Sequence, residues 1–166
     1  MGKNITIIMA FIAISLIRVN AQDSKLDKLE MYHDQGHYRL SLRKSKKLLK
    51  DSSYQNHPLP YMWKALCTAS VGLKKNKGLT NRLIESAEYF QTFSQFKTAN
   101  YYQQTYRIEI LNYQELFLNQ IAELKPKKSK LSRELFLVYQ NTFDDPITYE
   151  TIELITNGQL NSTNIN

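Results

Sequence analysis

"ANYYQQTYRIEILNYQELFLNQIAEL", residues 99–124, has the clearest helical pattern in the chain. Its apolar and aromatic side chains recur at steps of three and four residues, which is the spacing of one face of an α-helix. That face consists of Tyr102, Tyr106, Ile110, Tyr113, Phe117, Ile121 and Leu124. A second apolar strip on the opposite side consists of Ile108, Leu111, Leu118 and Ala122. Because a helix that is apolar on two sides is normally buried between neighbours, the pattern predicts one long central helix.

The rest of the chain has the same helical spacing and predicts an all-α fold of about six or seven helices around this central helix. Gly and Pro number only five and four among 166 residues, so little in the sequence interrupts the helices. Helices are expected to begin near residues 24, 37, 60, 80, 99 and 131, with polar loops at 74–78 and 125–130. Loops this short join successive helices into antiparallel hairpins.

The segment "ITYETIELI", residues 147–155, allows two interpretations. Its β-branched residues are typical of a strand. Asp145 as an N-cap and Pro146 in the first turn favour a short helix, which is the interpretation we prefer.

The N-terminus resembles a secretory signal peptide. After Lys3 comes the uncharged run "ITIIMAFIAISLI", residues 5–17, and then "RVNA" before Gln22. A basic start, a short apolar run and small residues before a cleavage site are typical of such a peptide, which we place at 1–21. The alternative is a retained membrane anchor, but a span needs about 20 apolar residues and this run ends at Arg18.

Cleavage after Ala21 predicts an exported protein, in the periplasm or outside the cell, with no transmembrane span. Residues 22–157 then form a single helical domain, and the polar tail 158–166 is expected to be disordered. Loss of Lys3 and Arg18 lowers the formal net charge from +7 to +5. The single Cys, Cys67, excludes an internal disulfide, so stability has to come from packing.

A second stretch, "DQGHYRLSLRKSKKLL" at residues 34–49, is strongly amphipathic. One side of the predicted helix carries Tyr38, Ser41, Leu42, Ser45, Leu48 and Leu49, and the other carries Arg39, Arg43, Lys44, Lys46, Lys47 and Lys50. The basic side is either the solvated outer face of a helical hairpin, which we favour, or a polyanion site. Aromatic residues do not alternate with the basic ones, and export removes the protein from nucleic acid, so no nucleic-acid partner is expected.

The order Tyr32, Gly36, Tyr38 and Ser41 resembles the centre of a tetratricopeptide repeat. The first and third predicted helices begin about 34 residues apart, near the period of that repeat. The loop 74–78 interrupts the register of a second repeat, so one repeat-like unit is expected rather than a regular array.

"KLEMYHDQGHYRLSLRKSKKLL" and "LPYMWKAL", within residues 26–72, resemble the N-terminal helical region of certain exported bacterial proteins. Some of those continue into a papain-like peptidase domain of the cell-wall hydrolase type. The resemblance implies a helical accessory region at the cell envelope. It carries no catalysis to this chain, since these 166 residues contain no such domain.

No catalytic, metal or cofactor site is predicted. His33 and His37 have the spacing of the HExxH zinc proteases, but Asp34 replaces the Glu and Gly36 breaks the helix. Cys67 with His57 is conceivable as a thiol–imidazole pair, yet Cys67 lies on the apolar stripe of its helix, which favours core packing. The protein is therefore expected not to be an enzyme.

Eleven tyrosines are the remaining unusual feature, with Tyr101, Tyr102, Tyr106 and Tyr113 close together. They either line a groove or fill the core, and the core is favoured. The leading prediction is an exported binding or scaffold module for a protein or peptide partner at the envelope. The alternatives are a polyanion or envelope-polymer binder using residues 39–50, and an accessory subunit of a cell-wall hydrolase. The candidate binding residues are Arg39, Arg43, Lys46, Lys47, Lys50, Tyr102 and Tyr106.

Overall fold

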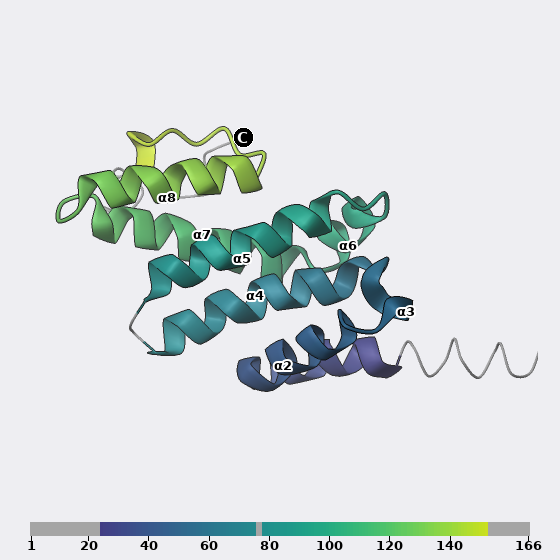
Figure 1. The fold of residues 1–166 in the computed structure, drawn as a ribbon. Helices are drawn as coiled ribbons and strands as arrows, with labels where there is room; N and C mark the ends of the chain where they lie inside the picture. Colours follow the sequence, from purple (N-terminus) through teal and green to yellow (C-terminus); the bar gives the residue numbers. More distant parts are fainter. Residues whose placement is uncertain (1–23, 76–77, 153–166) are drawn as a thin grey trace, which may run out of the picture.

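The computed structural model describes residues 24–75 and 78–152, which form eight helices and contain no strand (Figure 1). The all-α prediction is therefore confirmed for this part of the chain. The first helix covers residues 24–34. The others are α2 (Tyr38–Leu48), α3 (Ser52–Gln55), α4 (Pro58–Lys75), α5 (Leu79–Ser94), α6 (Ala99–Thr105), α7 (Arg107–Leu124) and α8 (Ser129–Thr142).

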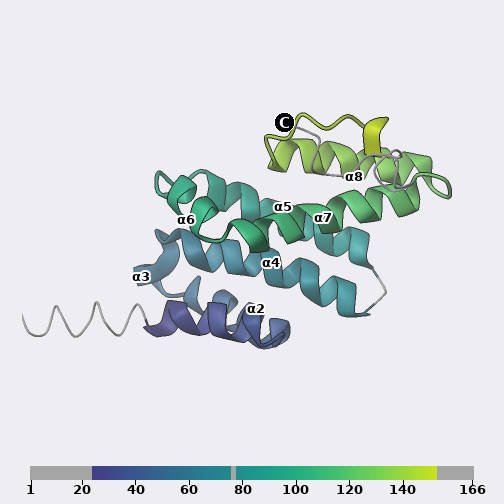
Figure 2. The ribbon, with the colours of Figure 1, turned by 180° about the vertical axis from the view of Figure 1, so that it is seen from behind.

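The long helices pair as three antiparallel hairpins: 24–34 with α2, α4 with α5, and α7 with α8. The hairpins lie side by side, because α4 packs against α2 as well as α5, and α5 packs against α8. The two short helices α3 and α6 belong to the connections between hairpins. Seen from behind, α6 and α7 lie in front of α5, so α5 and α7 occupy opposite faces of the stack (Figure 2).

Gly36 ends the first helix, as predicted. Its φ is +68°, in the left-handed region that a side chain disfavours. His37 N donates to Tyr32 O at 2.8 Å and Gly36 N donates to His33 O at 2.8 Å, which satisfies the last carbonyls of the helix. The chain then reverses directly into α2.

Small side chains let the first hairpin close tightly. Ser41 and Ser45 on α2 are completely buried. Ser41 Oγ donates to Leu29 O at 2.9 Å, across the hairpin, and Ser45 Oγ donates to Ser41 O at 3.0 Å. A similar close approach joins α4 to α5 at Gly72, where an added Cβ would lie 2.8 Å from Arg82 Cβ.

The prediction of one central helix over residues 99–124 is wrong. The helix ends at Tyr106, whose backbone angles are φ −108° and ψ 36°, so α6 and α7 are separate. The second apolar strip is also not buried throughout, since Ile108 is 70% and Leu111 49% exposed. The Tyr106 ring packs edge-on against Trp63, and its hydroxyl bonds Glu30, so tertiary contacts hold the chain at the break.

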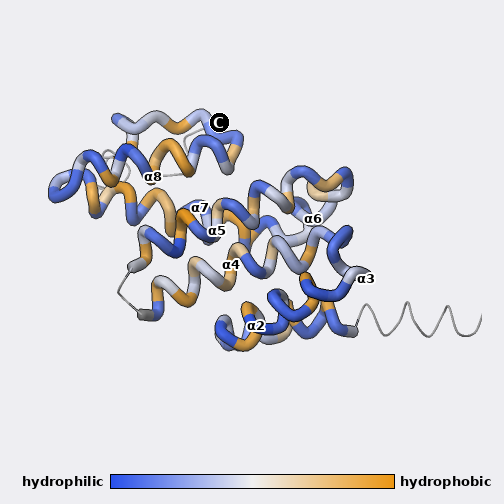
Figure 3. The backbone as a smooth tube through the Cα atoms, viewed as in Figure 1, coloured by the Kyte–Doolittle hydropathy of each residue, from blue (hydrophilic) through white to orange (hydrophobic). Residues whose placement is uncertain are grey.

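Helix α4 is instead the most enclosed helix of the described part. Residues on several sides of it have 3% exposure or less: Met62, Trp63, Ala65, Leu66, Cys67, Thr68 and Ala69. Neighbouring helices α2, α5 and α7 cover those sides. Figure 3 shows the contrast with α2, which is largely hydrophilic along its length.

Aromatic rings fill the space between α5, α7, α8 and the segment after α8. Phe90, Tyr113, Phe117, Tyr139 and Phe143 contact one another with centroid separations of 5.1 to 6.0 Å. The hydroxyl groups are satisfied: Tyr113 bonds Ser86 at 2.7 Å, and Tyr139 donates to Asp145. This cluster is the core of the C-terminal half.

Some predicted boundaries differ from the structure. Helix α5 begins at Leu79 with Gly78 as its N-cap, close to the predicted start near residue 80, and the short helix α3 was not predicted. Residues 144–148 have no regular secondary structure, although Asp145 Oδ1 accepts a bond from Ile147 N at 3.0 Å. Helix begins at residue 151 instead of at Pro146, because the 143–148 segment packs Phe143 and Ile147 into the core.

The predicted signal peptide, 1–21, and the predicted tail, 158–166, lie outside the described residues, as does the end of the 147–155 segment. None of the described helices is long and apolar enough to cross a membrane.

Candidate functional site

The cations of α2 are all exposed and border both edges of its charged side. Arg39, Arg43 and Lys46 line a shallow groove whose floor includes Leu42 and Val71. Val71 comes from α4, so this groove follows the α2–α4 seam. Three of the predicted site residues are thus brought together.

A second groove runs along the opposite edge of α2. Lys44 and Lys47 line it together with Lys25 and Lys28 of the first helix. Leu48 and Asp51 complete its lining. The proximity of Lys25 and Lys28 to the basic helix could not be predicted from the sequence, because it depends on how the hairpin closes. We call the two grooves together the basic surface; Lys50, also predicted, is exposed just beyond α2.

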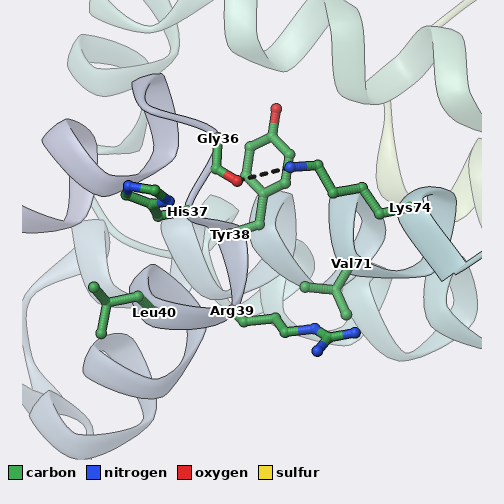
Figure 4. Close-up of a pocket in the computed structure, with 7 residues that line it drawn as sticks. All are labelled: Gly36, His37, Tyr38, Arg39, Leu40, Val71 and Lys74. Atoms are coloured by element: carbon green, nitrogen blue, oxygen red, sulfur yellow. Dashed lines mark hydrogen bonds between the residues drawn. The ribbon is translucent and has the colours of Figure 1, made fainter.

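A cavity of about 590 Å³ lies between the Gly36 turn and the end of α4 (Figure 4). Lys74 Nζ donates to Gly36 O at 2.8 Å and lies 4.7 Å from the centre of the Tyr38 ring. Lys74 therefore ties the first hairpin to α4. Arg39 extends beside Val71 and makes no such bond (Figure 4).

A cleft of about 290 Å³ separates α4 from α7; we call it the α4–α7 cleft. His33 and Tyr38 contribute to one end of it, and Leu66, Ser70 and Leu73 to the α4 side. The α7 side consists of Glu109, Asn112, Tyr113, Glu115, Leu116 and Asn119.

Three polar side chains in the α4–α7 cleft are exposed and make none of the hydrogen bonds of the described fold. Asn112, Glu115 and Asn119 are exposed and lie one above another, at spacings of three and four residues along α7. Within the described part of the chain, no hydrogen bond or ion pair involves any of these three side chains. Leu73 is 49% exposed at the α4 edge. The cleft thus offers free amides, a free carboxylate and an apolar contact.

The two candidate tyrosines are used largely by the fold. Tyr106 is half-buried, and its hydroxyl donates to Glu30 Oε2 at 2.9 Å. Burial, with the hydrogen bond to Glu30 and its charge, raises the pKa of Tyr106 far above the ordinary value. Tyr102 is also half-buried, and its ring lies 6.0 Å from that of His57. Neither residue lines the cavity or the surfaces described above.

Cys67 is fully buried, which confirms the core-packing interpretation. Burial raises the pKa of its thiol to about 12, against a smaller lowering by a hydrogen bond to Ser41. At neutral pH the thiol is therefore protonated and a poor nucleophile. His57 Nδ1 accepts from Leu59 N at 3.3 Å, so the imidazole caps the start of α4.

His33 packs against the rings of Tyr38 and Trp63, with centroids 5.2 and 4.9 Å away. His37 lies across the Gly36 turn and lines the cavity of Figure 4. Among the described residues, no three His, Cys, Asp or Glu side chains are grouped so as to hold a metal ion.

The chain matches no protein-family model, no curated protein and no solved structure. A function for the chain is therefore inferred from the geometry of these surfaces.

Proposed function

We propose that this chain is an exported, non-enzymatic helical module that holds an extended segment of a protein partner in the α4–α7 cleft. The observation that carries the proposal is the row of unpaired polar side chains on α7, opposite a half-exposed Leu73. Because these polar groups make no hydrogen bond within the fold, a ligand can bond them without breaking one.

The spacing of the two asparagines suits a peptide backbone. Asn112 and Asn119 are seven residues apart, so their axial separation is about 10 Å at 1.5 Å per residue. Three residues of an extended chain cover about the same length. Each side-chain amide both donates and accepts, so each can bond the N–H and the C=O of one peptide unit. Leu73 and Leu116 then contact an apolar side chain of the partner.

The arrangement of the hairpins supports the same proposal. Stacked helical hairpins form extended surfaces from the corresponding helices of successive hairpins, and repeat proteins bind partners on such surfaces. Here the lining of the cleft comes mainly from α4 and α7, the first helices of the second and third hairpins. The resemblance of residues 32–41 to a tetratricopeptide repeat favours this mode of binding.

The export and envelope parts of the proposal rest on the pattern of residues 1–21 and on the resemblance of residues 26–72. An accessory role beside a cell-wall hydrolase is one form that the partner interaction can take. Mass analysis of the protein recovered from its source tests export: a chain beginning at Gln22 is expected, and an intact Met1 end excludes cleavage.

Selection of peptides from a displayed linear library, followed by fluorescence anisotropy, tests the cleft. Asn112→Ala combined with Asn119→Ala removes four hydrogen bonds, two from each amide, of about 1 kcal/mol each, so affinity is expected to fall at least tenfold. Leu73→Glu is expected to act in the same direction.

Matched controls are available on other helices. Asn81 is exposed on α5, and Leu137 is 58% exposed on α8. Asn81→Ala and Leu137→Glu are expected to leave peptide affinity unchanged. If the cleft variants bind the selected peptides as well as these controls do, the α4–α7 cleft is not the binding site.

A further inference from the structure

We propose that the basic surface around α2 is a separate binding site for a linear polyanion bearing phosphate groups. The proposal goes beyond the peptide cleft and does not depend on it, since the two sites share no lining residue.

The first observation is the positive charge of the two grooves. Seven cations line the two grooves: Lys25, Lys28, Arg39, Arg43, Lys44, Lys46 and Lys47. The lining residues include one carboxylate, Asp51. That carboxylate accepts a hydrogen bond from Ser53 N at 3.1 Å and caps α3. The positive charge of the grooves is thus nearly uncompensated within them.

Within the described part of the chain, most of these cations have no ionic or aromatic partner. The ion pairs of the described residues are His33–Asp34 and Arg82–Glu85, and neither includes a groove residue. Lys25 alone among the seven lies over an aromatic ring, that of Tyr54, at 5.4 Å. Like charges three and four residues apart on a helix, such as Arg39 with Arg43, repel each other and destabilise the helix. An anionic ligand would convert this repulsion into attraction.

The shape of the surface favours a chain over a membrane. The cations border two grooves along α2 and do not form one flat plane. Proteins that lie on anionic bilayers also insert apolar side chains. The large hydrophobic residues that are exposed in the described part are Met31, Leu73, Tyr101, Ile108, Leu111 and Leu137, and none belongs to α2.

The composition of the grooves favours phosphates over bases. Single-stranded nucleic acids are held partly by stacking of bases on aromatic side chains. The described residues that line the grooves are cations, Leu42, Leu48, Val71 and Asp51, and none of these residues is aromatic. One Arg guanidinium group can donate two hydrogen bonds to two oxygens of the same phosphate. A Lys ammonium group attracts the phosphate as a compact positive charge. A polymer of phosphates without bases therefore fits best.

The test uses the chain from Gln22 to Asn166 and long-chain inorganic polyphosphate, with affinity measured over a series of salt concentrations. Each phosphate neutralised on a single strand contributes about 0.7 to the slope of log affinity against log salt. Arg39→Gln, Arg43→Gln and Lys46→Gln together are expected to lower that slope by about 2 and to weaken binding at least tenfold. Lys28→Gln, Lys44→Gln and Lys47→Gln test the second groove in the same way.

The control variant removes the same number of positive charges from a region outside the basic surface. Lys127, Lys128 and Lys130 are exposed in and next to the turn between α7 and α8, and their triple Gln variant is expected to bind like wild type. If this control weakens binding as much as the groove variants do, net charge alone is responsible and the proposal is wrong.

Two further probes separate the competing partners. Tighter binding to phosphatidylglycerol vesicles than to polyphosphate would assign the surface to a membrane, and tighter binding to single-stranded DNA would assign it to nucleic acid. Either result overturns the proposal. Peptide binding by the groove variants is expected to be unchanged, so failure at this surface is distinguishable from failure at the α4–α7 cleft.

Discussion

The two halves of the molecule pack the same kind of hairpin in different ways. In the N-terminal half, α2 closes on its neighbours through Ser41 and Ser45, and α4 approaches α5 at Gly72. In the C-terminal half, rings such as Phe117 and Phe143 fill the space between helices. Small side chains bring backbones close together, whereas aromatic side chains keep helices apart and bury large areas between them.

The difference determines how each half responds to change. A seam of small residues has no room for added atoms, so substitution by a larger side chain is expected to destabilise it. An aromatic cluster is stabilised by the apolar area that it buries, so truncation of one aromatic side chain is expected to destabilise it. Four variants test this contrast, and they follow in order of decreasing expected loss of stability.

Phe117→Ala is expected to have the largest effect. The side chain is fully buried and contacts the rings of Tyr113, Tyr139 and Phe143. Truncation of a buried Phe lowers the free energy of unfolding by about 3–5 kcal/mol, a large share of a domain's stability. Urea denaturation monitored by circular dichroism measures the free energy of unfolding. Ile108→Ala, at a 70% exposed site on the same helix, is the control, and equal losses would contradict an aromatic core here.

Ser45→Leu tests the seam of small residues. Ser45 is 0% exposed on α2, and a larger side chain there forces the hairpin apart, at a cost of about 1–3 kcal/mol. The neighbouring Lys44 is exposed, so Lys44→Leu is expected to change stability by about 0.5 kcal/mol or less. If Ser45→Leu were neutral, the first hairpin would be loosely packed and the contrast between the halves would disappear.

Tyr113→Phe separates hydrogen bonding from ring packing in the C-terminal half. The ring stays, but the bond to Ser86 is lost, which costs about 1 kcal/mol at neutral pH. Burial raises the pKa of Tyr113 above its ordinary value of 10.0, with the Ser86 bond acting weakly in the other direction.

The raised pKa of Tyr113 predicts a pH dependence with a definite sign. Above about pH 10 the unfolded tyrosine loses its proton while the folded one keeps it, so stability falls as the pH rises. Tyr113→Phe removes this contribution and is expected to lose less stability between about pH 9 and pH 11 than wild type. Urea denaturation at both pH values measures this difference in the free energy of unfolding. Tyr101→Phe, at a 65% exposed site, is the control. An unchanged pH dependence in Tyr113→Phe would argue against a buried hydroxyl.

Arg39→Gln combined with Arg43→Gln is expected to have the smallest effect on stability. Both side chains are exposed and repel each other, so the change in free energy of unfolding should be about 0.5 kcal/mol or less, of either sign. Lys46 and Lys47 lie in the last turn of α2, where positive charge favours the helix dipole, so their substitution costs slightly more. A loss of several kcal/mol in the Arg pair would show that the basic surface supports the fold.

Local patterns predicted much of the first hairpin. Gly36 ended a helix because a left-handed residue is needed there, and the charged side of residues 38–50 faced solvent because burying unpaired charge is costly. Cys67 was predicted to be in the core from its place on an apolar stripe. Each of these predictions uses only neighbours within a few residues along the chain.

The candidate sites were predicted only in part. Arg39, Arg43, Lys46 and Lys47 were named from the sequence, because the segregation of charge on one helix is visible there. Lys25 and Lys28 were missed, since nothing local shows that they lie beside α2. Asn112 and Asn119 were also missed: their spacing along α7 was visible, but the polar side of a helix is normally solvated and gives no sign of a cleft.

Periodicity and glycine conformation are local properties, so the amino-acid sequence alone predicts that the chain is helical, where several helices end, and which side of α2 is charged. The break of the 99–124 helix at Tyr106 and the central place of α4 depend instead on tertiary packing. Tyr106 contacts Trp63 and Glu30, residues far away in the chain. Contacts of that kind arise when hairpins stack, and no periodic pattern within one helix encodes them.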